Sequence, residues 1–168
     1  MASITDTASI VTSGATCVAL VFAGIELLRS RRRDQRRRRV ELEGVAVSWR
    51  PPQVPRGPQE ARERGLWVYD FTAYNPGRLP ISDVRVEVTF ALDVERLHYD
   101  GHPEEPTRTL ILETPVLAGG KERTWHRRLL MNYEDAHAAL PKTSAVISFI
   151  NPEDPSKRQE NRWPKSAG

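Results

Sequence analysis

An uncharged stretch near the N-terminus constrains this 168-residue chain more than any other feature. Asp6 and Glu26 are separated by nineteen consecutive residues without charge, Thr7 to Ile25. At about 1.5 Å per helical residue, such a stretch covers roughly 28 Å, close to the thickness of a bilayer's hydrocarbon core. The sequence therefore predicts a transmembrane helix over residues 8–28, preceded by a short extracytoplasmic N-terminus of residues 1–7.

A block of arginines follows this stretch directly. Its eight members are Arg29, Arg31, Arg32, Arg33, Arg36, Arg37, Arg38 and Arg39. Basic residues beside a span are enriched on its cytoplasmic side and attract anionic lipids, at about 1 kcal/mol each near the surface. We therefore expect residues 29–39 to be a juxtamembrane segment that contacts lipid head groups. The chain would cross the inner (plasma) membrane once, with its N-terminus outside and residues 40–168 in the cytoplasm.

Small residues recur at every fourth position of the apolar stretch. These residues are Ala15, Ala19 and Ala23, which would lie on one face of a helix. Small residues let two membrane helices approach closely, so this face predicts helix–helix contact and a possible homodimer. Alanines are also common in such helices without any dimer, and the pattern alone leaves both interpretations open.

The charge of the chain is concentrated before residue 40. Residues 1–39 hold eight arginines against three acidic side chains, a net +5, whereas residues 40–168 hold 17 basic and 19 acidic side chains, a net −2. A nucleic-acid-binding domain is expected to carry a basic surface of its own, so we expect no nucleic acid among the partners. The single cysteine, Cys17, cannot form an intrachain disulfide, which fits a reducing compartment.

From residue 40 onward, apolar and polar residues alternate as in half-buried strands. The clearest case runs from Ile81 to Leu92, with Val84, Val86, Val88 and Phe90 on one face. Six further strands are expected: Val40 to Trp49 with a bulge at Gly44, Leu66 to Tyr74, Thr107 to Thr114, Thr124 to Met131, Thr143 to Ile150, and Gln159 to Trp163. Only one short helix, from Asn132 to Leu140, interrupts them. This pattern predicts a mainly β domain, an antiparallel β-sandwich of about seven strands, over residues 40–168.

The run from Phe71 to Val86 is centred on the turn Asn75-Pro76-Gly77. It resembles the Asn-x-Gly turn and following strand of bacterial immunoglobulin-like and fibronectin-III-like domains. The whole layout resembles small actinobacterial single-pass membrane proteins with one N-terminal span and a cytoplasmic domain of this kind. The resemblance implies an N-terminal transmembrane helix followed by an immunoglobulin-like β-sandwich, and it implies binding more than catalysis.

Few residues of the chain match a catalytic or metal-binding motif. His98 and His102, with Glu104 and Glu105 nearby, are weak metal candidates in a segment that is otherwise an ordinary polar loop. The run Gly119-Gly120-Lys121 lacks the first glycine and the Mg²⁺-binding hydroxyl of a phosphate loop. We therefore expect no catalytic residue, no cofactor and no metal.

These features together predict a membrane-tethered protein-interaction module, an adaptor or recruitment domain without catalytic activity, whose protein partner is unidentified. The candidate binding surfaces are the proline-rich loop Arg50 to Gly65 and the loop His98 to Pro106, because loops on a rigid scaffold commonly carry recognition. One alternative is an accessory subunit of a membrane complex that assembles mainly through its transmembrane helix. The third is an enzyme or metal-binding domain with no recognisable motif.

Overall fold

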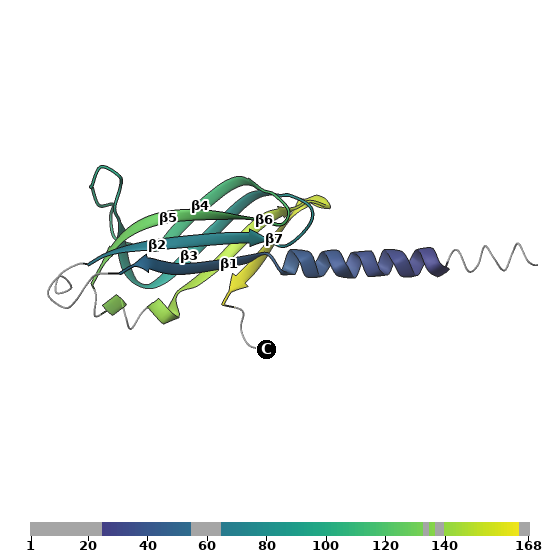
Figure 1. The fold of residues 1–168 in the computed structure, drawn as a ribbon, viewed down its shortest axis with the longest axis horizontal. Coiled ribbons are helices and arrows are strands. Elements are labelled where there is room, and N and C mark those ends of the chain that lie inside the picture. Colours follow the sequence, from purple (N-terminus) through teal and green to yellow (C-terminus); the bar gives the residue numbers. More distant parts are fainter. Residues whose placement is uncertain (1–24, 55–64, 133–134, 137–139, 165–168) are drawn as a thin grey trace, which may run out of the picture. The chain divides into compact units, whose positions relative to one another are not determined.

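Seven antiparallel strands make up most of the described chain (Figure 1). The computed structural model describes residues 25–54, 65–132, 135–136 and 140–164. The strands are β1 (Ala46–Gln53), β2 (Gly65–Asn75), β3 (Ile81–Arg96), β4 (Thr107–Leu117), β5 (Lys121–Met131), β6 (Ser144–Asn151) and β7 (Asp154–Trp163). A helix covers residues 25–43, and a 3₁₀ turn, η1, covers Leu140–Lys142.

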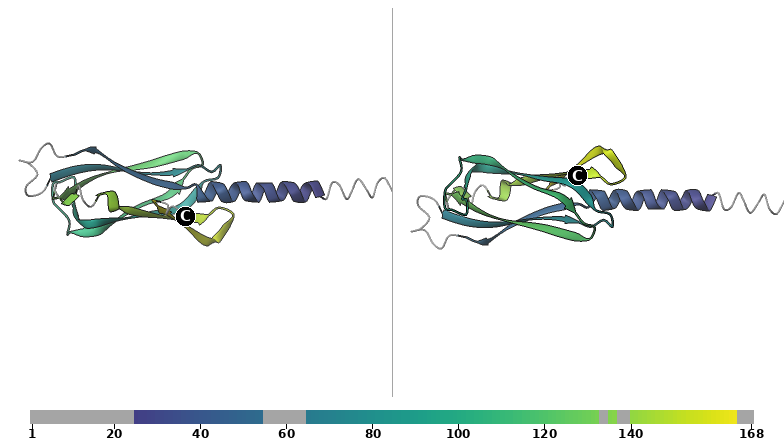
Figure 2. Two further views of the ribbon diagram at one scale, coloured as in Figure 1. Left: turned by 90° about the horizontal axis from the view of Figure 1, so that it is seen from below. Right: turned by 90° about the horizontal axis from the view of Figure 1, so that it is seen from above.

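The strands form one curled sheet whose two halves face each other as layers (Figure 2). One layer contains β1, β2 and β5, and the other contains β4, β3, β6 and β7. Strand β3 joins the layers, because its last residues leave the second layer and pair with β5, Glu95 with Leu130 and Arg96 with Leu129. The mainly β, seven-stranded antiparallel architecture is thus as predicted and is compatible with the predicted β-sandwich, with β3 making the two layers one continuous sheet.

The core lies between the two layers, and the period-two alternation of the strands accounts for it. Trp67, Tyr69, Phe71 and Ala73 of β2 are all buried, as their alternation predicts. The rings of Tyr69 and Phe71 stack with their centroids 5.7 Å apart. Burial raises the pKa of the Tyr69 hydroxyl well above its ordinary value, so this side chain stays neutral. Strand β3 contributes Val84, Val86 and Val88 from the opposite layer.

A bulge in β3 shifts its alternation at one point. The pairing of β3 with β6 advances three residues on β3, from Ser82 to Arg85, for two on β6. Asp83 stands inside this irregularity with a φ of 50°, in the left-handed region that aspartate tolerates better than most residues. Arg158 of β7 contacts the Asp83 carboxylate and donates to the Asp83 carbonyl oxygen over 3.0 Å, which holds the bulge from across β6.

Prolines occupy three strands, β1, β4 and β7, at positions outside the strand ranges that the sequence predicts. Pro51 and Pro52 lie in β1, Pro115 in β4 and Pro155 in β7. In the described sheet each of these strands pairs with only one neighbouring strand. A proline cannot donate to a ladder, so it is tolerated where one edge of the strand is unpaired.

The prediction of a transmembrane helix over residues 8–28 is wrong for the described part of the chain. No helix there combines the length and apolar character that a bilayer crossing needs. Residues 25–28 belong to the helix described over residues 25–43, which carries the eight arginines and is exposed as far as residue 40. Charges at this density are costly in hydrocarbon. Residues 8–24, including Ala15, Ala19 and Ala23, lie outside the described residues.

The chain divides into two compact units, residues 1–40 and 41–168. The prediction that the first strand begins at Val40 is also wrong, because Val40 and Leu42 are helical. Strand β1 starts only at Ala46. The single-pass topology and the membrane location depended on the predicted span, so neither enters the proposed function.

Candidate functional site

The connection between β3 and β4 forms a narrow hairpin that rises from the sheet (Figure 1). Leu97 and Pro103 form an antiparallel bridge, and the His98 amide donates to the His102 carbonyl oxygen over 3.0 Å. Below them, the Glu104 amide donates to the Arg96 carbonyl oxygen over 2.8 Å. These backbone bonds give residues 97–103, named here the 97–103 hairpin, a defined conformation.

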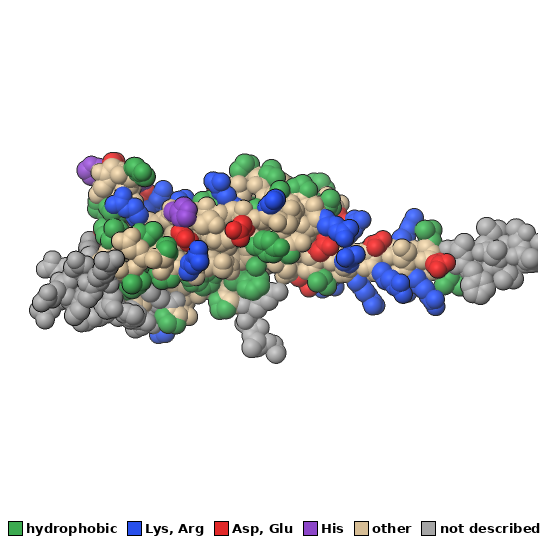
Figure 3. Space-filling model, viewed as in Figure 1, with side chains coloured by type: hydrophobic (Ala, Val, Ile, Leu, Met, Phe, Trp, Pro, Cys, Tyr) green, Lys and Arg blue, Asp and Glu red, His purple; other side chains and the backbone are tan. Residues whose placement is uncertain are grey.

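The tip of the 97–103 hairpin is a tight turn with an aromatic side chain on it. Gly101 has a φ of 87°, a conformation that glycine adopts without strain, and its amide donates to the His98 carbonyl oxygen over 3.1 Å. The Asp100 carboxylate accepts from the His102 amide over 3.0 Å. Tyr99 is 100% exposed, and hydrophobic, acidic and histidine side chains gather at this tip in Figure 3.

Side chains join the two arms of the hairpin at its base. Oε1 of Glu104 lies 2.6 Å from Nε2 of His98 and 3.4 Å from Nη1 of Arg96. The hairpin is also attached to the sheet, because the Leu97 amide donates to the Arg128 carbonyl oxygen of β5 over 2.8 Å. Tyr99 is therefore held away from the sheet on a support that is fixed at both arms.

The predicted metal site at His98 and His102 does not gain further ligands. Within the described residues, no group of three or more His, Cys, Asp or Glu side chains is placed to hold a metal ion. His98 uses Nε2 to contact Glu104, and the hydrogen bonds that join His102 to its neighbours come from its backbone. Both histidines thus take part in the structure of the hairpin.

A second polar cluster lies across β1, β2 and β5, on the face opposite the core. Arg50, Asp70 and His126 are cross-strand partners in one row. Nδ1 of His126 lies 2.5 Å from Oδ1 of Asp70, and Nε of Arg50 lies 3.8 Å from Oδ2 of Asp70. Asp70 is only 8% exposed, because neighbouring side chains cover it. A histidine with acidic and basic neighbours is visible on this face in Figure 3.

The Asp70–His126 pair, like the Glu104–His98 pair, places a carboxylate beside an imidazole. A carboxylate that orients an imidazole is one part of an acid–base site. In the described residues, however, no other side chain hydrogen-bonds to the His126 ring. The row lies along strands of a sheet face and serves as a cross-strand ion pair.

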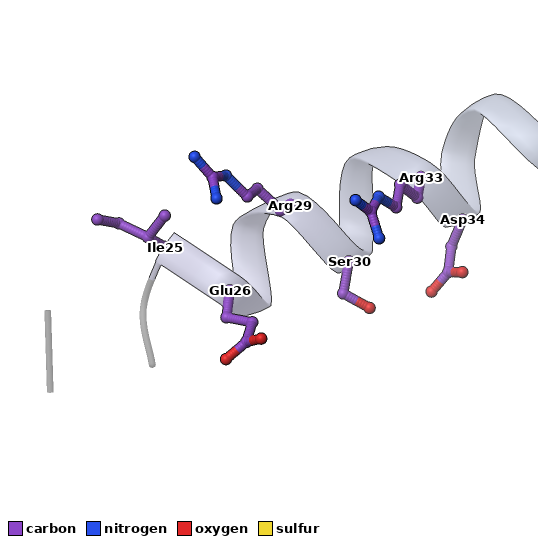
Figure 4. Close-up of a pocket in the computed structure, with 6 residues that line it drawn as sticks. All are labelled: Ile25, Glu26, Arg29, Ser30, Arg33 and Asp34. Carbon is purple, nitrogen blue, oxygen red and sulfur yellow. The ribbon is translucent and has the colours of Figure 1, made fainter. Parts of the chain in front are cut away.

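The other predicted surfaces are placed only in part. Arg50 to Gln53 of the loop Arg50–Gly65 belong to β1, and residues 55–64 lie outside the described residues. The eight arginines lie on the helix over residues 25–43, and their contact with lipid is untested. A surface hollow between residues 25 and 34 is lined by six residues of this helix, shown in Figure 4. One isolated helix surface does not form an enclosed site.

Sequence reasoning missed the cluster of Arg50, Asp70 and His126 because it joins residues from three strands. It named His98 and Glu104 but did not predict that they pair with each other. Asp70 and His126 are 56 positions apart. His98 and Glu104 are close in sequence, but their pairing depends on the hairpin turn at Gly101. Finding the pair of Asp70 and His126 requires the register of β2 against β5. The alternation of apolar and polar residues does not specify that register.

Comparison with known proteins adds little to this geometry. No protein-family model and no curated protein matches the chain. Among solved structures, the chain is similar to the X-ray structure of Northeast Structural Genomics Consortium target SoR45, with 10% sequence identity and a TM-score of 0.33. The match covers 70% of this chain and 79% of that one. A likeness at this level supports no inference about function, and it does not test the predicted resemblance.

Proposed function

We propose that this protein is a protein-interaction module that binds its partner through the 97–103 hairpin. The observation that carries the proposal is the complete exposure of Tyr99 on a hairpin whose base is fixed by backbone bonds and by Glu104. An exposed tyrosine offers a large contact area with few rotatable bonds, and tyrosine is enriched among residues that dominate binding energy. A rigid support reduces the entropy that is lost on binding.

The two alternatives from the sequence receive less support. The hypothesis of an accessory subunit assembled through a transmembrane helix required the predicted span, and no described helix has the length and apolar character of one. An enzyme would need a substrate site around a reactive group, whereas His126 is 74% exposed on a sheet face. Binding through a hairpin requires an exposed side chain on a fixed support, and Tyr99 on the 97–103 hairpin has both.

Site-specific crosslinking in cells tests the proposal with the full chain. A photo-crosslinking amino acid replaces Tyr99 in one variant and Tyr74 in a matched control, since Tyr74 is an exposed tyrosine on a strand, β2. A partner that crosslinks at position 99 and not at position 74 is then purified. Its affinity is measured for the wild-type chain and for Tyr99→Ala and Tyr74→Ala.

Tyr99→Ala is expected to weaken binding about 30-fold, which corresponds to the roughly 2 kcal/mol of an interface hot spot. Tyr74→Ala is expected to leave the affinity unchanged. The fold does not complicate this comparison, because Tyr99 contributes nothing to the core. Equal crosslinking at both positions, or wild-type affinity in Tyr99→Ala, would rule out the hairpin as the binding element.

A further inference from the structure

Three arginines lie on the same face of β3 and β5 as the core residues, and two of them, Arg96 and Arg127, lie near the base of the 97–103 hairpin while Arg123 is exposed farther along β5. Along β5, Trp125 and Leu129 are buried, so Arg123 and Arg127 point to the same side of the strand by alternation. Arg96 joins them because it is the cross-strand partner of Leu129. Arg123, Arg96 and Arg127 are named here the arginine cluster.

The arginine cluster lies along an edge of β5 that has little strand pairing. Strand β2 covers the other edge from Lys121 to Met131, whereas β3 pairs with β5 only at Leu129 and Leu130. In the described residues, no strand pairs with this second edge between Lys121 and Arg127. Nη1 of Arg127 donates to the His126 carbonyl oxygen over 2.9 Å.

The cluster contains more positive than negative charge. Burial and then the charge of Arg96 lower the pKa of Arg127, with a smaller contribution from Arg123, and Glu104 is the one carboxylate that opposes them. Oε1 of Glu104 is already shared between Arg96 and His98. Nε of Arg127 is buried and has no hydrogen-bond partner among the described residues. A donor of this kind can be satisfied by an additional anion.

We propose that Arg96 and Arg127, with Arg123 farther along β5, bind carboxylate side chains in an acidic segment of the partner protein. The inference rests on the proposed function, because the cluster adjoins the base of the hairpin that carries Tyr99. Guanidinium groups hold carboxylates through paired N–H donors, and partial burial strengthens such charge-assisted bonds. Tyr99 would then supply apolar contact, and the arginine cluster would select an acidic sequence.

The test observes Arg127 directly in the full chain. The side-chain Nε–Hε resonances of arginine are followed by NMR during titration with a hexaglutamate peptide, and with hexaglutamine as an uncharged control. We expect saturable shifts of the Arg127 and Arg96 resonances with hexaglutamate alone. The eight arginines of the helix over residues 25–43 also attract this peptide, so the resolved Arg127 signal is the measure of binding at the site.

Two neighbouring substitutions with the same charge change provide the control. Arg127→Gln is expected to weaken hexaglutamate binding roughly tenfold, as followed by the Arg96 resonance, because a charged hydrogen-bond donor is lost. Arg128→Gln alters the opposite face of β5 and is expected to leave it unchanged. Arg96→Gln, followed by the Arg127 resonance, provides a second variant if Arg127→Gln does not fold.

The possible outcomes separate this inference from the proposed function. Equal weakening in Arg127→Gln and Arg128→Gln, or shifts with hexaglutamine as large as with hexaglutamate, would overturn the carboxylate site. Loss of partner binding in Tyr99→Ala would still support the hairpin in that case. Conversely, hexaglutamate binding at Arg127 combined with wild-type partner affinity in Tyr99→Ala would support the anion site and reject the hairpin as the binding element.

Discussion

At the scale of single residues, Asn75 connects two turns that lie far apart along the sequence. It is 1% exposed, and its Nδ2 donates to the carbonyl oxygens of Leu79 over 2.9 Å and Leu117 over 3.2 Å. Its Oδ1 accepts from the Gly77 amide over 3.0 Å. The turn after β2 is thus fixed to the turn between β4 and β5. A Cβ on Gly119 in that second turn would lie 2.2 Å from the Arg78 carbonyl oxygen, so only glycine fits there.

The substitution Asn75→Asp tests this role, because it keeps the shape of the side chain and removes its donor. A carboxylate would then face carbonyl oxygens in a buried site, and we expect a loss of about 3 kcal/mol in the free energy of unfolding. Urea denaturation of both proteins at neutral pH measures the difference.

Asn151→Asp is the matched control for this prediction. The Asn151 side chain accepts from the Glu153 amide over 2.9 Å, a bond that a carboxylate can also make. We expect this change to alter stability by less than about 0.5 kcal/mol. If both substitutions cost the same, the donor of Asn75 is not what stabilises the turns.

At the scale of elements, side chains of β7 close the curled sheet where β7 approaches the start of β1. Nδ2 of Asn161 donates to the carbonyl oxygens of Leu42 over 2.9 Å and Val45 over 3.0 Å. Nε1 of Trp163 donates to the same Val45 oxygen over 3.3 Å. These bonds satisfy backbone acceptors that no strand pairing reaches, and they join the two layers on the side opposite β3.

Asn161→Ala should therefore destabilise the contact between β7 and the start of β1 more than it destabilises the pairing of any single strand. Two partly buried carbonyl oxygens each lose one of two donors, since Leu42 keeps the Val45 amide and Val45 keeps Nε1 of Trp163. We expect a cost of about 1 kcal/mol in the free energy of unfolding. Hydrogen exchange should become faster at Val45 and Val47, and urea denaturation gives the global cost. Glu160→Ala, an exposed position on the same strand, serves as the control, and equal effects there would contradict the junction.

The elements show how far alternation alone reaches. It predicted the buried faces of β2 and β3, since Trp67, Phe71 and Val86 are all in the core. It failed for Val40 and Leu42, because two apolar residues spaced by two do not distinguish a strand from a helix that continues past them. The prolines of β1 were assigned to a loop, although one unpaired edge tolerates them.

The candidate sites were less accessible to sequence reasoning than the fold. The loop of His98 was recognised as a binding candidate, but Arg96 and Arg127 become neighbours only through the pairing of β3 with β5. Asp70 and His126 likewise depend on the register of β2 against β5. The alternation of apolar and polar residues predicts which face of the strand a side chain occupies. It does not predict which residue lies opposite on the next strand.

At the scale of the whole molecule, the buried core residues among those the structure describes all belong to the second of the two compact units. The core residues lie between Val45 and Phe149, and this unit covers residues 41–168. The single cysteine, Cys17, lies in the first unit. The described residues of the second unit include no metal-ligand group of three or more side chains. Its stability should therefore come from packing and hydrogen bonds within the sheet.

We predict that the excised fragment of residues 41–168 folds by itself and unfolds in one cooperative transition. Its free energy of unfolding should be in the ordinary range of roughly 5–10 kcal/mol, and the transition should coincide by circular dichroism and tryptophan fluorescence. A chelator or a thiol reductant should not shift the midpoint, because the fragment contains no cysteine and its described residues form no metal-ligand group of three or more side chains. Loss of structure on chelation would instead indicate that His98 and His102 hold a metal. Separate transitions for the two probes would contradict a single cooperative unit, and a fragment without a folded core would indicate that the core depends on residues 1–40.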